Sequence, residues 1–577
     1  MSADGHRPAE RRTHRPWPVL GWLPGYRRAR LGKDTIGALT AWALIVPECV
    51  AYAQIAGVPP QNAFYAAPVA LVAYALLGTS RFLVVGATSA AAVLSAATVT
   101  EVSADPKDAA ALSAALAMIA GAVLVVAGIA RLGFLAAFLS EPALVGFLFG
   151  MALTIIVRQA AKILGVPGGD GNFFERAWDL LAHAGDWHAA TIAVGAAALV
   201  ALFALERWLP RLPASLVVLA AGIAVSAAFS LDDHGIETVG KIPSAVPVPG
   251  WPDIPANDWL TLTAGAFGLA LVVFAESYSI SGRFARDHDD TVDADREMTA
   301  MGAANVAAGL FKGFAVSGSA SRSAAAEASG GASQMVSVVA AVFVLLTGAF
   351  LTPLFTDLPE PVLGAIVVVA VRSFLKVAEI RRYRALDKAN FAIAATALAG
   401  VLFFDLLPGL LIAAGLSLIM FIGYSSRPRI AVLGRIPGTS TWGDTEDQPG
   451  AATTPGVLVI RPDGQLFFGN ADRLKDAVRD QVARAAPAPH TVVLNLVGSY
   501  GLGVPVLDTL GDLRTELARE RFELRLARVH ADTASRLRDH ALGKALGPDH
   551  IHVTVSDAIN AATTPHPAPP PDAPTPR

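Results

Sequence analysis

Long apolar segments constrain this chain more than any other feature of its sequence. A helix that crosses the hydrocarbon core of a bilayer needs about 20 mostly apolar residues. Candidate segments begin near Thr35, Ala63, Gly86, Ala109, Phe134, Ala189, Ala214, Thr261, Met298, Ser319, Met335, Glu360, Phe391 and Leu407. With 53% hydrophobic and only 16% charged residues, most of the chain must face lipid. The sequence therefore predicts an α-helical polytopic membrane protein of about 14 segments.

Two of these segments differ from the others, and they indicate an internal repeat. The segments that begin at Gly86 and Ser319 are short, follow a glycine and are rich in alanine and serine, which is typical of half-helices. Glu48 lies in the first segment of the first half, and Glu276 lies in the first segment of the second half. The interval from Glu48 to Gly86 is nearly that from Glu276 to Gly318. We therefore predict two inverted repeats of seven segments each.

Basic residues at the segment ends predict the orientation in the membrane. Arg27, Arg28, Arg30 and Lys33 precede the first segment, and no cleavage site of a signal peptide follows a short hydrophobic core. Such basic flanks stay in the cytoplasm. An even number of segments returns the chain to that side, and two further basic groups agree with this, namely Arg381, Arg382, Arg384 and Lys388, and Arg427, Arg429 and Arg435. We expect a multi-pass protein of the cell membrane (plasma or inner) with both termini cytoplasmic.

Hydropathy drops after the last segment, and the pattern becomes that of a soluble α/β domain. Residues 456–460 and 491–496 read as buried strands, and 471–486 and 506–518 read as amphipathic helices. The predicted divisions are a basic segment 1–32, a membrane domain 33–425 with repeats at roughly 33–230 and 260–425, a linker 426–455, a soluble domain 456–562 and a disordered proline-rich tail 563–577.

The half-helices predict where an anion would bind. Irregular backbone inside a membrane is tolerated only where protein buries it or water reaches it. Two helix N-termini that face one another offer unpaired N–H groups and partial positive charge. Hydroxyls and one cation flank them, so the predicted anion-binding residues are Thr88, Ser89, Gly318, Ser319, Ser321 and Arg322.

Glu48 and Glu276 are costly groups in otherwise apolar segments. Near an anion site they make most sense if they can take up a proton, which predicts a role in proton coupling. Two alternatives stay open: Arg322 is a structural partner of one acid, or both acids are held permanently ionised. Tyr52, one turn after Glu48, offers a hydroxyl or simply packs. Residues 287–297 read as a solvated loop.

Other classes of function find little support. The histidines lack metal-ligand spacing, no phosphate-binding loop with lysine occurs, and Cys49 is the single cysteine. The net charge of −3 does not suggest a nucleic-acid partner. We therefore predict no catalytic residue, no metal, no cofactor and no enzyme activity.

The sequence resembles the sulfate permease (SulP) family of anion transporters. The stretches that carry the resemblance are 47–60 (PECVAYAQIAGVPP), 77–86 (LGTSRFLVVG), 140–147 (SEPALVGF) and 318–324 (GSASRSA). Residues 464–471 (GQLFFGNA) and 492–498 (VVLNLVG) are similar to a STAS domain. The chain departs from the family pattern at Glu48, where many members have glutamine, and at Ala87 and Ala315, where they have proline.

This resemblance implies core and gate domains, an elevator-like movement, a cytoplasmic STAS domain and a homodimer. It places the anion site on Glu48, Tyr52, Thr88, Glu276, Ser319, Ser321 and Arg322. The leading hypothesis is a secondary active anion transporter that couples sulfate uptake to protons. The alternatives are transport of bicarbonate or a dicarboxylate, an uncoupled anion pathway, or an anion-sensing scaffold, with an unknown cytoplasmic partner at the STAS domain.

Overall fold

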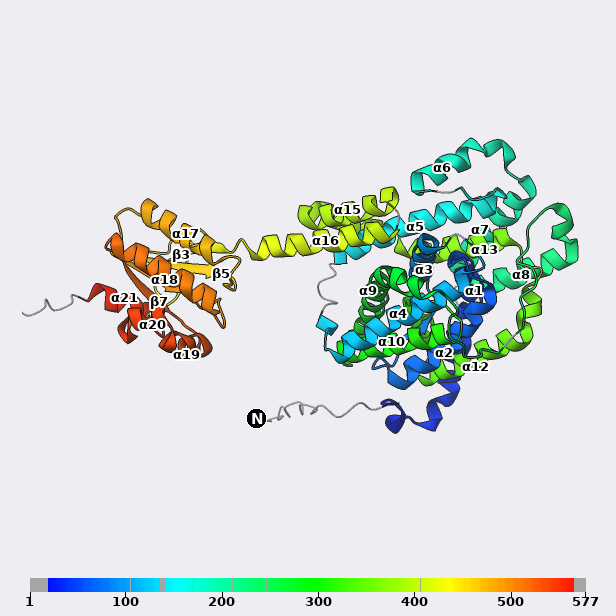
Figure 1. The fold of residues 1–577 in the computed structure, drawn as a ribbon, viewed down its shortest axis with the longest axis horizontal. Helices are drawn as coiled ribbons and strands as arrows, with labels where there is room; N and C mark the ends of the chain where they lie inside the picture. The colour runs from blue at the N-terminus through cyan, green and yellow to red at the C-terminus, as the bar shows by residue number, and fades with distance from the viewer. Residues whose placement is uncertain are drawn as a thin grey trace, which may run out of the picture. The chain divides into compact units, whose positions relative to one another are not determined.

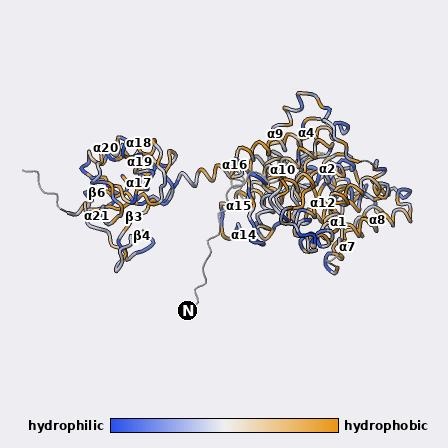
Figure 2. Tube along the Cα trace, turned by 90° about the horizontal axis from the view of Figure 1, so that it is seen from below, coloured by the Kyte–Doolittle hydropathy of each residue, from blue (hydrophilic) through white to orange (hydrophobic). Residues whose placement is uncertain are grey.

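The computed structural model describes residues 19–564 except 104, 135–140, 170, 210–211, 245 and 405. The predictions for residues 1–18, for Ser140 and for the tail from 565 lie outside the described residues. The chain divides into two compact units, one up to Ser417 and one from Leu418 (Figure 1). Much of the first unit is hydrophobic along its trace (Figure 2).

The first unit is mainly helical, and its apolar, alanine-rich segments account for this. Its first half contains α1 (Leu31–Ile55), α2 (Pro60–Leu77), α3 (Ser89–Val102), α4 (Ala109–Ile129), α5 (Glu141–Leu164), α6 (Phe173–Ala182), α7 (Ala189–Trp208) and α8 (Ala214–Phe229). Its second half contains α9 (Ala256–Asp287), α10 (Ala294–Leu310), α11 (Ala320–Ala328), α12 (Met335–Leu346), α13 (Glu360–Val371), α14 (Val377–Leu386), α15 (Lys388–Phe404) and α16 (Leu406–Ser425), which runs into the second unit.

Every predicted membrane segment contains a helix. Within the described ranges, seven helices are long and apolar enough to cross a membrane, and five shorter apolar helices accompany them. The predicted class, a helical membrane domain followed by a soluble α/β domain, is confirmed.

The packing of the helices repeats itself between the two halves. In a seven-segment repeat, α1, α2, α3 and α4 correspond to α9, α10, α11 and α12. In the first unit, α4 packs against α9 and α10, and correspondingly α12 packs against α1 and α2. Likewise α3 packs against α9, and α11 packs against α1. Each contact thus has a partner with the halves exchanged, as an inverted repeat requires.

The contacts also separate the helices into two groups. We call α1–α4 with α9–α12 the first helix group; Figure 1 shows α4, α9 and α10 close together within it. We call α5, α7, α8, α13 and α15 the second helix group, in which α5 packs against α13 and α15, and α13 packs against α7 and α8. Helix α1 touches both groups, because it also contacts α8 and α13.

The second unit contains a six-stranded sheet in the order β4-β3-β5-β6-β7-β8. Its strands are β3 (Arg429–Arg435), β4 (Trp442–Asp444), β5 (Val457–Asp463), β6 (Thr491–Asn495), β7 (Glu523–Ala527) and β8 (Ile551–His552). Strands β5 to β8 pair in parallel, and β3 pairs antiparallel to β5. The helices are α17 (Ala471–Arg484), α18 (Val504–Arg519), α19 (Ala531–Asp539), α20 (Ala541–Leu546) and α21 (Val555–Thr563). The two predicted strands and two predicted helices are confirmed.

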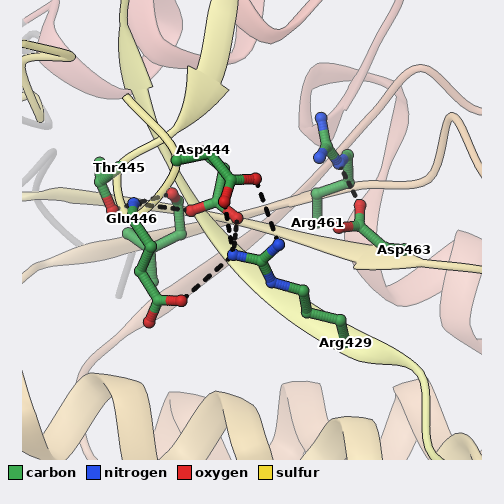
Figure 3. A network of polar contacts seen from close by, with 8 residues as sticks. Arg429, Asp444, Thr445, Glu446, Arg461 and Asp463 are labelled. Carbon is green, nitrogen blue, oxygen red and sulfur yellow. Dashed lines mark hydrogen bonds and ion pairs between the residues drawn. The ribbon is translucent and has the colours of Figure 1, made fainter. Parts of the chain in front are cut away.

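The region 426–455, which the sequence suggested as a linker, contributes β3 and β4 to this sheet. Arg429 in β3 holds the β4 end through ion pairs with Asp444 at 2.8 Å, Asp447 at 3.1 Å and Glu446 at 3.2 Å (Figure 3). Asp444 is buried, while Arg429 is half exposed, so this network fixes geometry more than it adds stability. The other predicted domain boundaries stay predictions.

Candidate functional site

A two-stranded ladder brings the two half-helices together. Strand β1 (Val84–Gly86) pairs antiparallel with β2 (Ser317–Ser319), and Val85 lies opposite Gly318. Helix α3 begins three residues after β1, and α11 begins directly after β2. Because the strands are antiparallel, the two short helices leave the ladder in opposite directions and their N-termini lie near one another. The two predicted half-helices are therefore present.

Each half-helix has a hydroxyl cap. Thr88 Oγ1 accepts a hydrogen bond from the Ala91 amide at 3.4 Å, and Ser319 Oγ accepts one from the Arg322 amide at 3.4 Å. Capping of this kind satisfies only one of the free amides in a first turn. The remaining amides of both first turns keep their partial positive charge at the same place in the molecule.

Arg322 connects the two junctions. Its side chain is 1% exposed, and its Nη2 donates a 2.7 Å hydrogen bond to the carbonyl oxygen of Ala87, before α3. Its Nε lies 3.3 Å from Oε2 of Glu48 on α1, in a geometry that forms an ion pair but no hydrogen bond. A methyl group on Gly86 would collide with the Arg322 guanidinium. One arginine of the second repeat thus braces the half-helix entry of the first.

Glu276 has a neutral partner instead. Its Oε2 accepts a 2.8 Å hydrogen bond from the Ser317 hydroxyl. The neighbouring Ser277 hydroxyl donates to the carbonyl of Val273 at 2.6 Å and accepts from the amide of Gly318 at 2.9 Å. The sequence analysis missed both serines, although each stands beside a residue that it had selected.

The other selected residues lie around these junctions. Tyr52 is buried one turn after Glu48, and Ser89 is buried at the start of α3. Ser319 and Ser321 share a 3.0 Å hydrogen bond between their hydroxyls, and Ser321 is exposed. The Gly318 amide is already bonded to Ser277, so Gly318 contributes close backbone packing rather than a free donor.

One expectation about this region is wrong in part. Residues 287–297 were expected to form a solvated loop, and residues 288–293 do connect α9 to α10 outside the core, but Glu297 lies in α10 with no exposed surface. Its carboxylate accepts hydrogen bonds from Tyr74 Oη at 2.7 Å, the Thr79 amide at 2.6 Å and the Ser80 amide at 3.1 Å. The hydroxyls of Thr79 at 2.6 Å and of Ser281 at 3.2 Å bring the donors to five. This carboxylate therefore fixes the loop that leads into β1.

The cation of the site, Arg322, is already paired with an acid, and this limits what the site can do chemically. Arg322 and Glu48 neutralise one another, so the attraction for an anion comes mainly from the two half-helix N-termini and the hydroxyls beside them. In the described part of the chain, no group of three or more histidine, cysteine, aspartate or glutamate side chains could hold a metal ion. The arrangement suits reversible binding of a small anion.

A second acid paired with arginine lies in the soluble unit. Glu523 Oε1 is 2.8 Å from Nη2 of Arg525 and 2.7 Å from Nε2 of His550. Partial burial alone would raise the pKa of Glu523, but the hydrogen bond from Arg525 and its charge hold that pKa below its ordinary value. Burial and then the charge of Arg525 lower the pKa of His552.

Comparisons with known proteins identify relatives over nearly the whole chain. Residues 31–397 match the Sulfate permease family, and residues 448–558 match the STAS domain. A Mycobacterium tuberculosis (strain CDC 1551) protein named "Probable sulfate transporter" is 35% identical over 548 residues, which cover 94% of this chain and 98% of that protein. High affinity sulfate transporter 1 of Stylosanthes hamata is 29% identical over 94% of this chain and 85% of its own length.

A solved structure has the same fold. The murine solute carrier 26 family member A9 anion transporter in the inward-facing state superimposes with a TM-score of 0.87, at 21% sequence identity, over 95% of this chain and 94% of that chain. At this identity the likeness concerns the fold.

Proposed function

Because the chain belongs to the sulfate permease family of anion transporters, we propose that it is a secondary active transporter that couples the uptake of sulfate to protons. Both relatives described above are named as sulfate transporters, which makes sulfate the first substrate to test. We place the protein in the cell membrane with both termini in the cytoplasm, as a homodimer.

The observation that carries this proposal is the meeting of two capped half-helices at the β1–β2 ladder. Two helix N-termini supply amide donors and partial positive charge without adding a free cation. Because this attraction comes from helix N-termini and not from a free cation, the site can bind an anion selectively and still release it. Exposed Ser321 and partly exposed Glu48 leave this site open to an arriving ion.

Glu276 is the proposed carrier of the proton. Its partner is a serine hydroxyl, whereas Glu48 has the permanent charge of Arg322 beside it. An uncompensated carboxylate next to a bound anion favours uptake of a proton, since the neutral form removes the repulsion. Binding of a proton and binding of an anion then support one another through linkage.

The two helix groups support an elevator-like movement. All proposed anion-binding residues belong to the first helix group, and α1 is a helix through which this group contacts the second. At that contact, Gln54 of α1 accepts a hydrogen bond from Lys162 at 2.7 Å and donates one to Glu360 at 3.3 Å. These few hydrogen bonds can break and be replaced by others while the first helix group moves as a rigid body.

The test uses the purified full-length protein in proteoliposomes with radiolabelled sulfate, bicarbonate and a dicarboxylate, each with and without an inward proton gradient. Accumulation of sulfate that collapses with a protonophore supports the proposal. Uptake that only equilibrates would indicate an uncoupled pathway. Binding without any flux would indicate an anion sensor.

A further inference from the structure

Helix α14 carries an exposed basic surface that the anion site does not use. The helix is short and connects α13 to α15. It forms the charged end of the candidate span Glu360–Leu386 that begins with α13, and the shorter apolar helix α15 follows it. Figure 2 labels α14 beside α15, and α14 also packs against α5. Connectivity therefore keeps α14 at the edge of the membrane rather than across it.

One face of α14 is anchored in the protein. Tyr383 is buried and packs with Val145 of α5 and Ala394 of α15, and Ile380 lies against the same cluster. This anchoring fixes the rotation of the helix about its axis. The opposite side chains are consequently presented to the surroundings in a defined way.

The exposed side of α14 is strongly basic. The exposed cations are Arg381, Arg382 and Arg384 on α14, with Lys376 directly before the helix and Lys388 at the start of α15. Of these, Arg382 lies 3.3 Å from the carboxylate of Glu379. No ion pair is recorded for the other four within the described residues. Leu386 stands among them with 81% of its surface exposed.

We propose that α14 binds the anionic headgroups of membrane lipids, and that it thereby holds the second helix group to the cytoplasmic leaflet. A cluster of four to eight basic residues on a short helix at a membrane surface attracts anionic lipid, whereas a zwitterionic surface offers it no net charge. The exposed leucine adds apolar contact with the same surface. The occupant is thus an anionic lipid headgroup, held at the membrane by its acyl chains.

This attachment would keep the second helix group stationary in the membrane while the first helix group moves. Helix α14 contacts α5 and α15 of the second helix group, while the anion site belongs to the first. The side of the membrane rests on the proposed orientation of the chain, but lipid binding by α14 depends neither on transport nor on coupling.

The test measures retained lipid on the full-length protein. Protein is purified from nanodiscs of phosphatidylcholine that contain phosphatidylglycerol, and the bound phosphatidylglycerol is counted by mass spectrometry. The test variant is Arg381→Gln/Arg384→Gln/Lys388→Gln. The matched control, Arg473→Gln/Arg519→Gln/Arg538→Gln, removes three exposed cations from α17, α18 and α19.

We expect each charge removed from α14 to lower the affinity for the anionic surface about fivefold, and the control to leave it unchanged. Equal retention by the α14 variant and the parent overturns the proposal. Equal losses in both variants also overturn it, because they would show a response to net charge only. Soluble glycerol phosphate should not displace the lipid, and displacement would identify a headgroup-sized anion site instead.

A second measurement keeps all the basic residues and so avoids a folding defect. Leu386→Cys is labelled with a fluorophore, since the single native cysteine, Cys49, is buried. Nitroxide on the headgroup of an anionic lipid should quench this label more than nitroxide on phosphatidylcholine. The same label at exposed Val553 should show no such preference. Equal quenching of the Leu386 label by both lipids contradicts the proposal.

Discussion

Glu48 and Glu276 occupy matching places in the two repeats, and their surroundings differ. Glu48 lies beside the guanidinium of Arg322, and Glu276 lies beside the hydroxyl of Ser317. The first acid therefore has a permanent counter-charge, and the second has a partner that can also accept a hydrogen bond. An inverted repeat thus supplies two similar helices, and the difference between the partners of the two acids underlies the proposed roles of Glu48 in bracing and Glu276 in coupling.

The largest expected effect comes from Arg322→Ala. This change leaves a mostly buried carboxylate unpaired and removes the hydrogen bond to Ala87, so we expect a loss of about 3–5 kcal/mol of stability and no measurable anion binding. Thermal unfolding in detergent and equilibrium binding of sulfate would measure both. The double variant Arg322→Ala/Glu48→Gln should recover stability but not binding. Full stability of the single variant would contradict the bracing role.

The next effect comes from Gly86→Ala, which tests the bracing without removing a charge. The new methyl group would collide with the Arg322 guanidinium, and overpacking of a buried site costs roughly 1–3 kcal/mol. We expect a strongly reduced transport rate. Gly423→Ala in α16 is the matched control, because nothing lies within 4 Å of a methyl group at that position. Normal transport by Gly86→Ala would show that Arg322 need not stay at Ala87.

Glu276→Gln should separate transport from coupling. The amide mimics the protonated acid, so anion exchange should continue while accumulation under an inward proton gradient is lost. Glu48→Gln should retain accumulation, because the coupling acid is untouched. Counterflow and gradient-driven uptake in the same proteoliposomes provide the two readings. If Glu276→Gln concentrates sulfate as well as the parent does, Glu48 becomes the better candidate for the proton carrier.

A smaller effect is expected from Ser317→Ala. Loss of one hydrogen bond to a charged group costs about 1.5–3 kcal/mol at most, and here it removes the donor that favours ionised Glu276. The pH dependence of sulfate uptake should therefore move to higher pH, with little change in maximal rate. Ser321→Ala is a suitable comparison, since its hydroxyl bonds to Ser319 rather than to Glu276. An unchanged pH profile would separate Ser317 from the coupling acid.

The smallest effect concerns Glu523, which is paired with arginine outside the membrane as Glu48 is inside it. Its pKa is lowered in the folded state, so it stabilises the fold above the ordinary glutamate pKa, and this contribution is lost as the pH falls through the folded value. Glu523→Gln should lower the unfolding temperature of the soluble unit slightly at pH 7, and this difference should shrink as the pH falls below the ordinary glutamate pKa of about 4.3. A difference that persists unchanged into acid would refute this pairing.

The sequence predicted the helical segments because each is long, apolar and separated from the next by turn residues or charges. It also located both half-helices, since glycine followed by small and hydroxyl side chains is a local pattern. It left open that Arg322 pairs with one of the two acids, as it does with Glu48. It could not choose between the acids or place Arg322 beside Ala87, because three distant parts of the chain meet there. Glu297 was misread for the same reason: its charge suggests solvent, and only the fold supplies its five donors. Region 426–455 looked like a linker because charged residues flank the apolar centre of β3 and because β4 has only three residues.

The β1–β2 ladder also has a consequence for biogenesis. Val85 pairs with Gly318, so the first repeat finds its partner strand only after synthesis of the second repeat has reached Gly318. Until then the polar backbone of β1 has no ladder partner, which is costly inside hydrocarbon. The first repeat therefore stays incomplete in the membrane until β2 has been made. A mutation near Gly318 would then impair the insertion of α3, although α3 is synthesised long before Gly318.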